Sequence, residues 1–157
     1  MPLIHLETFI KAPVETVFDL SRSVDLHKAS MQHHNEKIIG GVSKGLMNKG
    51  DTVTWQAKHL FVYRTLKVKL TECLPATFFA DEMMEGDFKK MRHEHVFKTA
   101  QGGTLMIDDF YFESPFGIIG KLVNAVFLTA YMVRLLTERN KEIKRIAEAS
   151  LGNQFLI

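Results

Sequence analysis

Between Asp51 and Glu113, hydrophobic and polar residues alternate with a period of two in several short segments. In residues 51–60 one face carries Val53, Trp55, Ala57 and His59, and the other carries polar residues. This alternation is typical of a β-strand with one buried face. The pattern predicts strands at residues 3–11, 37–39, 51–60, 62–73, 78–84, 89–99 and 104–113, most of them separated by turns that contain glycine or proline.

Two short helical segments are predicted after the first strand. Pro13 is well placed at the first position of a helix, and the hydrophobic residues that follow recur at helical spacing up to Leu20. Residues 24–34 are polar and rich in histidine, with Leu26 and Met31 as hydrophobic anchors. We interpret this second segment as either a short helix or an irregular turn.

The segment from Ser114 to Ser150 contains no proline after Pro115 and predicts one long helix. One side of this helix carries a stripe with steps of three or four residues. The first half of the helix is apolar on nearly all sides, so a second set of apolar residues must also be buried, beyond the one face that packs on the core. The stripe comprises Ile119, Leu122, Val126, Ala130, Val133, Leu136, Asn140, Ile143 and Ala147, and the second set comprises Leu128, Tyr131, Met132 and Leu135, whereas Arg139 is placed among the charged residues of the other faces.

The order of these elements predicts an α+β fold, because the strands are grouped apart from the helices. We expect one domain over residues 1–157, in which an antiparallel sheet of about seven strands curves around the long C-terminal helix. A chain of 157 residues is long enough to bury a core without disulfides or metal.

Composition and charge narrow the expected partners. The chain is 46% hydrophobic and 24% charged, which is ordinary for a globular protein. Its net charge is +2, and its lysines and arginines are dispersed among acids, so no nucleic-acid partner is expected. Cys73 is the single cysteine, so an internal disulfide is excluded.

The sequence also indicates a compartment. Its start lacks a basic region followed by a long apolar run, so the cytoplasm is the expected location. Residues 118–136 approach the length of a membrane span, but Lys121, Asn124 and Arg134 interrupt them, which favours a helix that covers the sheet. Peripheral contact with a membrane and a homodimer through this helix remain alternatives.

Candidate chemistry gathers on two neighbouring strands. Alternation places Met91, His93, His95 and Phe97 on one face of residues 89–99, and it places Asp108 on the same face as Met106, Phe110 and Phe112 in the next strand. If both faces point inward, Asp108 lies near His93 or His95. We interpret this group first as a polar network that braces the strands, second as a ligand anchor, and third as a proton-transfer site.

A metal site is not predicted. His27, His33, His34, His59, His93 and His95 supply enough imidazoles for zinc, but no His-x-x-x-His pair occurs. The adjacent pair His33 and His34 is not expected to point the same way in a regular element. The glycines lack the setting of a phosphate-binding loop, and no serine stands in a Gly-x-Ser-x-Gly motif, so no cofactor and no catalytic nucleophile are predicted.

Several short motifs then suggest a family. They are Pro75 to Phe78, Asp81, Glu82, Gly86 to Phe88, His93 to Phe97, Gly102 to Thr104, Met106, Asp108 and Ser114 to Gly117. With the order of elements, they resemble the helix-grip SRPBCC superfamily, which includes StAR-related lipid-transfer proteins and the birch-pollen allergen. The resemblance is to a bacterial ligand-binding branch with polyketide cyclase-like or cell-division-inhibitor-like labels, from which Asp87 and Met91 depart.

The resemblance implies a cavity between the sheet and the long helix that holds a small hydrophobic ligand, such as a lipid, polyketide or isoprenoid. The alternatives are a cyclase or dehydratase that uses a pocket histidine, and an interaction module that docks a partner or membrane through Leu128, Tyr131, Met132 and Leu135. We expect a binding protein rather than an enzyme. The predicted ligand-binding residues are Trp55, His59, Met91, His93, His95, Phe97, Met106, Asp108, Phe110, Leu122, Val126, Ala130 and Val133, of which His93, His95 and Asp108 are also the catalytic candidates.

Overall fold

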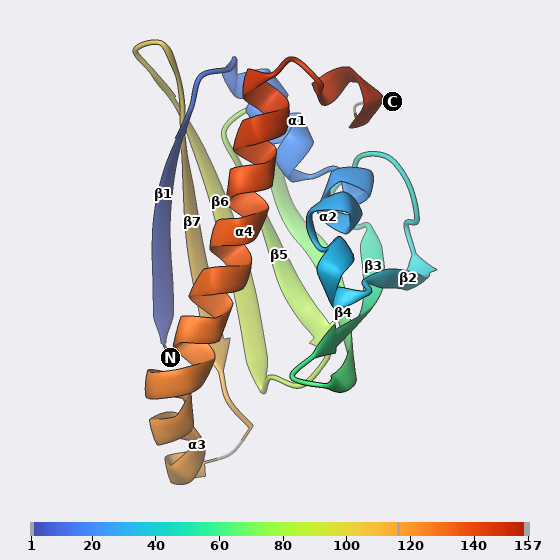
Figure 1. Cartoon of the computed structure of the whole chain (residues 1–157), viewed down its shortest axis with the longest axis vertical. Coiled ribbons are helices and arrows are strands. Elements are labelled where there is room, and N and C mark those ends of the chain that lie inside the picture. The colour runs from blue at the N-terminus through green and yellow to red at the C-terminus, as the bar shows by residue number, and fades with distance from the viewer. Residues whose placement is uncertain (1, 116, 156–157) are drawn as a thin grey trace.

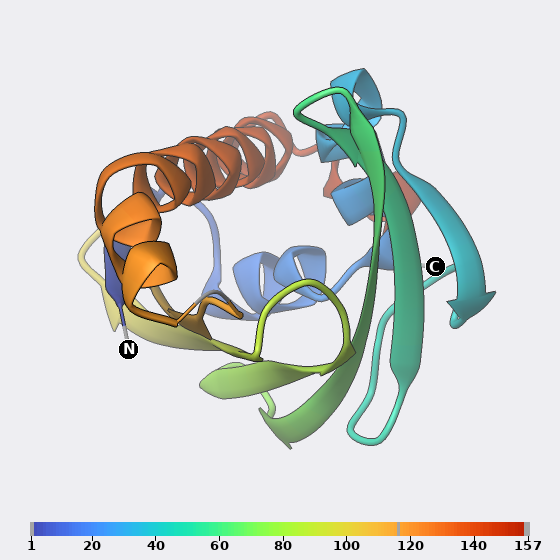
Figure 2. The ribbon, with the colours of Figure 1, turned by 90° about the horizontal axis from the view of Figure 1, so that it is seen from below.

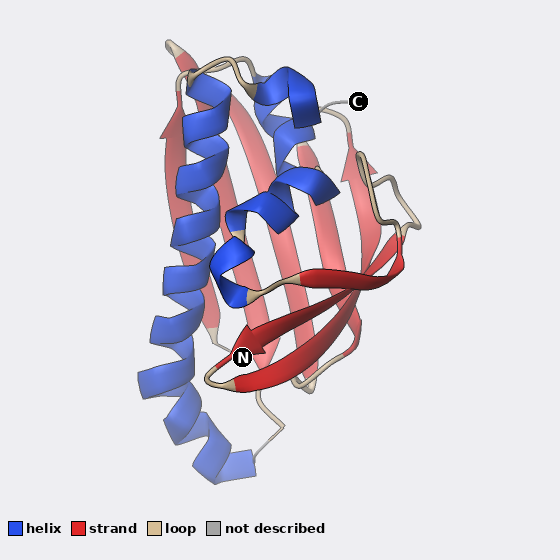
Figure 3. Cartoon of the chain, turned by 45° about the vertical axis from the view of Figure 1, so that its right-hand side comes forward, coloured by secondary structure: helices blue, strands red, loops and turns tan. Residues whose placement is uncertain are grey.

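The computed structural model describes residues 2–115 and 117–155. Seven strands form one antiparallel sheet, and the helices lie on one of its faces (Figures 1 and 3). The strand order is β1-β7-β6-β5-β4-β3-β2, so every strand except β1 lies beside its neighbour in the sequence. The strands are β1 (Leu3–Ile10), β2 (Lys37–Gly41), β3 (Thr52–His59), β4 (Val62–Leu74), β5 (Phe78–Glu85), β6 (Lys90–Ala100) and β7 (Gly103–Glu113).

Two short helices and a 3-10 turn connect β1 to β2. They are α1 (Val14–Ser21), α2 (Val24–Ser30) and η1 (Gln32–His34). The side chain of Ser23 caps α2 by accepting a hydrogen bond from the backbone N–H of Leu26 at 3.2 Å. Residues 24–34 therefore form a capped helix followed by a separate 3-10 turn.

The C-terminal helical segment is continuous but not uniform. It consists of α3 (Gly117–Val123), the π-helical turn η2 (Asn124–Leu128) and α4 (Thr129–Glu148), and a 3-10 turn, η3 (Gly152–Phe155), follows. The prediction of a long helix here is confirmed for α4. The π-helical turn was not predicted.

The sheet is strongly curved, and Figure 2 shows it bending around the helices from β1 to β2. Irregular pairing accompanies this curvature, because the register shifts once between β2 and β3 and twice between β4 and β5. Gly41 allows the backbones of β2 and β3 to approach closely, since a Cβ atom at this position would lie 2.1 Å from the carbonyl oxygen of Thr52. The predicted α+β helix-grip architecture is therefore confirmed.

The hydrophobic core joins the helices to the face of the sheet that they cover. Phe18 of α1 makes edge-to-face contacts with Phe79 and Phe97, at ring-centroid distances of 5.7 and 5.3 Å. Ile143 and Ile146 bring α4 into the same cluster. Among the described residues, no helix is sufficiently long and apolar to span a membrane.

Candidate functional site

A cavity of about 740 Å³ lies between the curved sheet, the α2 segment and α4. Most of its wall is apolar. All of the strands from β3 to β7 contribute side chains to it, as do α2 and α4. The apolar wall includes Val24, Met31, Met47, Val53, Trp55, Val68, Leu70, Phe79, Met91, Phe110, Leu135 and Leu136.

One group of polar side chains lies together in this wall. His93 and His95 project from β6, Asp81 projects from β5, and Arg139 projects from α4. The pairing of β5 with β6 sets Asp81 opposite His93, so the two strands hold these groups in a fixed register. The cavity therefore offers both hydrogen-bond donors and acceptors at a defined place.

Asp108 lies behind the two histidines and holds them together. Its side chain is 0% exposed, and one oxygen, Oδ1, accepts a hydrogen bond from Nε2 of His93 at 2.9 Å. Nδ1 of His95 lies at the same distance from this oxygen, but its orientation does not form an aligned hydrogen bond. The other oxygen, Oδ2, accepts a bond of 2.6 Å from Nδ2 of Asn140. Asp108 thus joins β7, β6 and α4.

Arg139 and Asp81 complete this network. Nη2 of Arg139 donates to the carbonyl oxygen of Ser21 at 2.9 Å, and Nη1 lies 3.7 Å from Asp108. Nε2 of His95 donates to Oδ2 of Asp81 at 3.1 Å. A buried carboxylate needs such partners, because water cannot solvate its charge.

The network shifts the pKa values of its members. Burial alone would raise the pKa of Asp108, but its contacts with His93 and His95 outweigh burial and hold this pKa well below the usual range. In Asp81 the bond from His95 likewise outweighs burial and lowers the pKa. Burial lowers the pKa of His93 to about 4, and the neighbouring His95 adds to this effect. At neutral pH the ring of His93 is therefore uncharged and the two carboxylates are ionised.

Two further polar contacts line other parts of the cavity. His27 stacks on Trp55 with ring centroids 4.3 Å apart, and its Nε2 lies 2.9 Å from the buried carboxylate of Glu36. His59 bonds through Nδ1 to the hydroxyl of Tyr131 at 2.8 Å. Burial lowers the pKa of His59, which favours its neutral form.

The structure brings most of the predicted strand residues to the cavity. Trp55, His59, Met91, His93, His95 and Phe110 all line it. Phe97 and Met106 lie in the core and do not reach the cavity wall, and Asp108 lies behind the wall. The prediction that Asp108 lies near His93 or His95 is confirmed by distance.

The predicted helix residues require a correction. Leu122 and Val126 are each 72% exposed, and Ala130 is exposed as well, so these side chains point away from the cavity. Val133 packs against the core and does not line the cavity. The physical reason is that the helical segment before α4 extends beyond the end of the sheet (Figures 1 and 3), where Ile118 and Ile119 are exposed as well, and that Ala130 lies on the outer side of α4.

The face predicted to dock a partner also contributes to the cavity. Leu128, Tyr131, Met132 and Leu135 line it; Leu135 is buried and the other three are half-buried. Arg139, which the charge pattern places on a solvated face, is 5% exposed, so that prediction is wrong. The reason is that its guanidinium bonds to the carbonyl oxygen of Ser21 and lies close to Asp108 in the buried network.

Some functional residues were not identified from the sequence. Asp81 stands between Phe79 and Met83 on the inward face of β5, and a charged residue on an apolar face is a signal for a buried partner. Asn140 similarly interrupts the apolar stripe of α4. Both signals were present, but their partners depend on contacts between distant segments.

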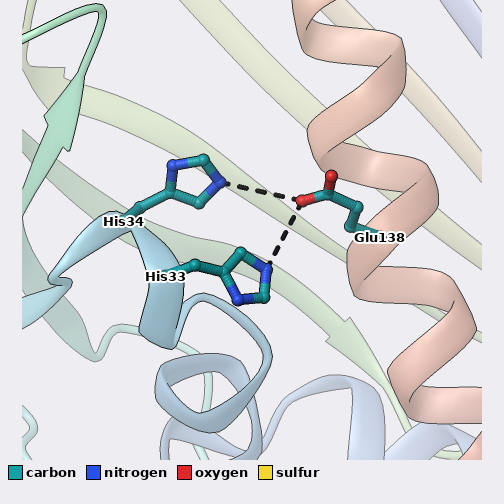
Figure 4. A group of neighbouring side chains, drawn as sticks. All are labelled: His33, His34 and Glu138. Carbon is teal, nitrogen blue, oxygen red and sulfur yellow. Dashed lines mark ion pairs between the residues drawn. The ribbon is translucent and has the colours of Figure 1, made fainter.

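His33 and His34 are closer together than the sequence suggests. In η1 the two rings point toward the same carboxylate oxygen, Oε2 of Glu138, and each Nε2 lies 3.7 Å from it (Figure 4). The expectation that these adjacent side chains diverge is therefore wrong, because a short 3-10 turn does not impose the alternation of a strand.

Comparison with known proteins gives similarity in structure only. No protein-family model matches the sequence, and no curated protein is significantly similar to it. A protein from Thermus thermophilus has a similar structure with a TM-score of 0.77, at 18% identity over 95% of this chain and 99% of that one. The major latex-like protein 151 of Panax ginseng gives a TM-score of 0.69, at 14% identity over 93% and 97% of the two chains.

A third similar structure is the di-domain ARO/CYC StfQ from the steffimycin biosynthetic pathway. Its TM-score is 0.76 at 12% identity, and the match covers 96% of this chain but 52% of StfQ. Identities this low establish a common fold and leave function open. The chain has the helix-grip fold that its sequence predicts.

Proposed function

We propose that this protein binds a small, mainly hydrophobic ligand in the cavity between the sheet and α4. The observation that carries the proposal is the cavity itself, whose volume of about 740 Å³ is typical of ligand-binding pockets. A core that served only stability would be close-packed, with few voids larger than a water molecule. The apolar wall would supply affinity at about 2.5 kcal/mol per 100 Å² of ligand surface removed from water.

The polar groups of the wall favour a ligand with at least one hydroxyl or carbonyl group. His93, His95, Asp81 and Arg139 lie together in the wall, and further polar groups such as His27 and His59 lie elsewhere among mainly apolar residues. Such an arrangement orients an amphiphilic molecule, because its polar end can replace water only where these groups lie. Lipid-like, polyketide-like and isoprenoid-like molecules all have this character.

A second candidate function is a cyclase-type or dehydratase-type enzyme in which His93 moves a proton. The contact between His93 and Asp108 in the cavity wall favours this alternative, as does the similarity in structure to StfQ. The pKa of His93, about 4, argues against it, because a general base works best with a pKa near the operating pH. Binding is therefore the function we prefer.

Trp55 provides a direct test of binding, because it is the single tryptophan and lines the cavity. An amphipathic fluorescent probe, 1-anilinonaphthalene-8-sulfonate, is titrated into the protein while Trp55 emission is recorded. We expect saturable energy transfer from Trp55 to one bound probe, and displacement of the probe by long-chain fatty acids or by aromatic polyketides. Binding that does not saturate would contradict the proposal.

Two matched variants locate the bound probe. Ala57 is buried and lines the cavity, so Ala57→Leu fills part of the cavity and should weaken binding at least about tenfold, which corresponds to 1.4 kcal/mol. Ala130→Leu adds the same atoms on the exposed side of α4 and should leave the affinity unchanged. Equal effects of the two substitutions would place the probe outside the cavity.

The enzyme alternative has a separate test. Wild-type protein, His93→Ala and His95→Ala are each incubated with reactive polyketide chains, and products are separated by mass. Turnover in the wild type that is lost in His93→Ala would favour the enzyme, whereas binding without turnover in all three proteins supports the preferred function.

A further inference from the structure

A second cluster of titratable side chains lies outside the polar network of the cavity. It consists of His33 and His34 in η1 and Glu138 in α4, and Figure 4 shows both rings facing the carboxylate. The three potential ligand atoms all lie within 4.8 Å of one another. Two segments separated by more than a hundred residues are thus brought together at this point.

Two atoms of the cluster are buried without a hydrogen-bond partner. They are Nε2 of His34 and Oε2 of Glu138, which face each other at 3.7 Å, too far for a hydrogen bond. A buried polar atom without a partner is unfavourable and indicates a missing partner or ion. An ion between these atoms would satisfy both of them at once.

The carboxylate is arranged so that one oxygen stays available. Nε of Arg134 donates to Oε1 of Glu138 at 3.1 Å, which leaves Oε2 directed at the two imidazoles. Oε2 is therefore the oxygen that can act as a ligand between the two rings.

We propose that His33, His34 and Glu138 form a binding site for a divalent transition-metal ion such as zinc. Two imidazole nitrogens and one carboxylate oxygen are a ligand set that zinc uses in proteins, and nitrogen ligands disfavour calcium and magnesium. With bonds of about 2.0 to 2.1 Å, the ligand atoms of a tetrahedral zinc ion lie about 3.4 Å apart. The two separations of 3.7 Å between imidazole nitrogen and carboxylate oxygen need to shorten by a few tenths of an ångström, and the two imidazole nitrogens lie within 4.8 Å of each other.

The proposed ion has a structural consequence for the cavity. Met31 and Glu36, on either side of η1, line the cavity, as do Leu135 and Arg139, on either side of Glu138. An ion bound between η1 and α4 thus holds two sides of the cavity wall together. The fourth coordination position is left for water or for another donor.

The test uses the full chain without a polyhistidine tag, stripped with a chelator and then freed of it. Zinc chloride is titrated by calorimetry, and cobalt chloride serves as a spectroscopic probe, since tetrahedral cobalt gives visible absorption bands. We expect one equivalent of zinc, a higher thermal midpoint with zinc, and cobalt bands in the visible range. Absence of one-to-one binding at about 0.1 mM zinc, well above the dissociation constant of a folded structural site, would overturn the proposal.

Three substitutions and one control locate the ion. His33→Ala, His34→Ala and Glu138→Gln should each lower zinc affinity at least about tenfold. Substitution of a residue that only supports a metal ligand already lowers metal affinity by about this factor, and these three residues are ligands themselves. The side chain of His33 is 67% exposed, so His33→Ala tests the site without loss of folding. His5→Ala, at an exposed histidine far along the sheet, should have no effect.

One other group of residues could hold an ion, namely Asp81, His93 and His95 in the cavity wall. Nε2 of His93 bonds to Asp108 and Nε2 of His95 bonds to Asp81, and Nδ1 of His95 is the buried atom of this group without a hydrogen-bond partner, so the group lacks the facing pair of unpartnered atoms that His34 and Glu138 present. Zinc affinity that falls in Asp81→Asn and is unchanged in His33→Ala would assign the ion to that group and overturn the proposal.

Discussion

At the scale of single residues, Asp108 is the carboxylate around which the buried polar side chains of the site are arranged. It is fully buried and is held by Asn140 and His93, with His95 and Arg139 close by. Each of these side chains comes from a sheet strand or from α4, so the charge of one carboxylate connects elements that are distant in sequence. Loss of this carboxylate leaves several buried polar groups without a partner.

We therefore predict that Asp108→Ala lowers the free energy of unfolding by about 3 to 5 kcal/mol, the cost of breaking a buried charged pair. Urea denaturation followed by circular dichroism measures this change. Asp109→Ala is the matched control on the opposite face of β7, where the partner is the exposed His5, and it should cost about 1 kcal/mol or less. Similar losses for the two variants would refute the buried network.

The pKa of His93 predicts a dependence of stability on pH. The folded-state value of about 4 lies below the ordinary value of 6.5, so the unfolded chain binds a proton in this window that the folded chain does not. The free energy of unfolding should therefore decrease as pH falls from 6.5 to 4, by up to about 3 kcal/mol from this residue. Asp108 and Asp81 have lowered pKa values, so their contributions persist above pH 3.8 and are lost only below it.

Urea titrations at several pH values check this dependence in the wild type and in His93→Gln, which cannot be protonated. The variant should show a shallower slope between pH 6.5 and 4. An identical slope in both proteins would mean that His93 is not the group that titrates.

Prediction of single site residues from the sequence succeeded where alternation along a strand is enough to tell which face of the sheet a side chain occupies. The period of two in β6 and β7 placed His93, His95 and Asp108 on one buried face, and the strand pairing then sets His95 directly opposite Asp108. Asp81 and Asn140 were missed as partners, because their contacts depend on the register of β5 and on the position of α4 over the sheet. No periodicity within one segment contains that information.

At the scale of elements, the position of the C-terminal helical segment relative to the sheet is the feature that most changes the site. A helix that lay over the sheet along its whole length would bury Leu122 and Leu136 on the same side, since both belong to one stripe of helical spacing. The segment before α4 instead extends beyond the end of the sheet (Figure 1), so Leu122 is 72% exposed, whereas Leu136 is 6% exposed and lines the cavity. A hydrophobic pattern does not reveal where a helix passes the end of a sheet, so the sequence placed only the C-terminal half of this helix correctly.

This difference predicts unequal costs for the same substitution. Leu136→Ala should lower the free energy of unfolding by about 2 to 4 kcal/mol, because it removes buried methyl groups. Leu122→Ala should change it by less than about 0.5 kcal/mol. Chemical denaturation measures both, and equal losses would indicate that both leucines are buried.

At the scale of the whole molecule, the order of elements was sufficient to predict the architecture. Consecutive strands separated by tight turns form a meander, and β1 closes the sheet beside β7. The cavity was expected from the resemblance and not from hydrophobicity, because side chains that fill a core and side chains that line a cavity follow the same pattern. Its size depends on the curvature of the sheet and on how far α4 lies from it.

The central claim is that a guest molecule occupies this cavity, and native mass spectrometry of protein purified from its own host tests it most directly. The account predicts an added mass that is released on denaturation, extracts into organic solvent and decreases in Ala57→Leu but not in Ala130→Leu. Protein that carries no added mass, and that also fails to take up the fluorescent probe in the Trp55 titration, would contradict the account.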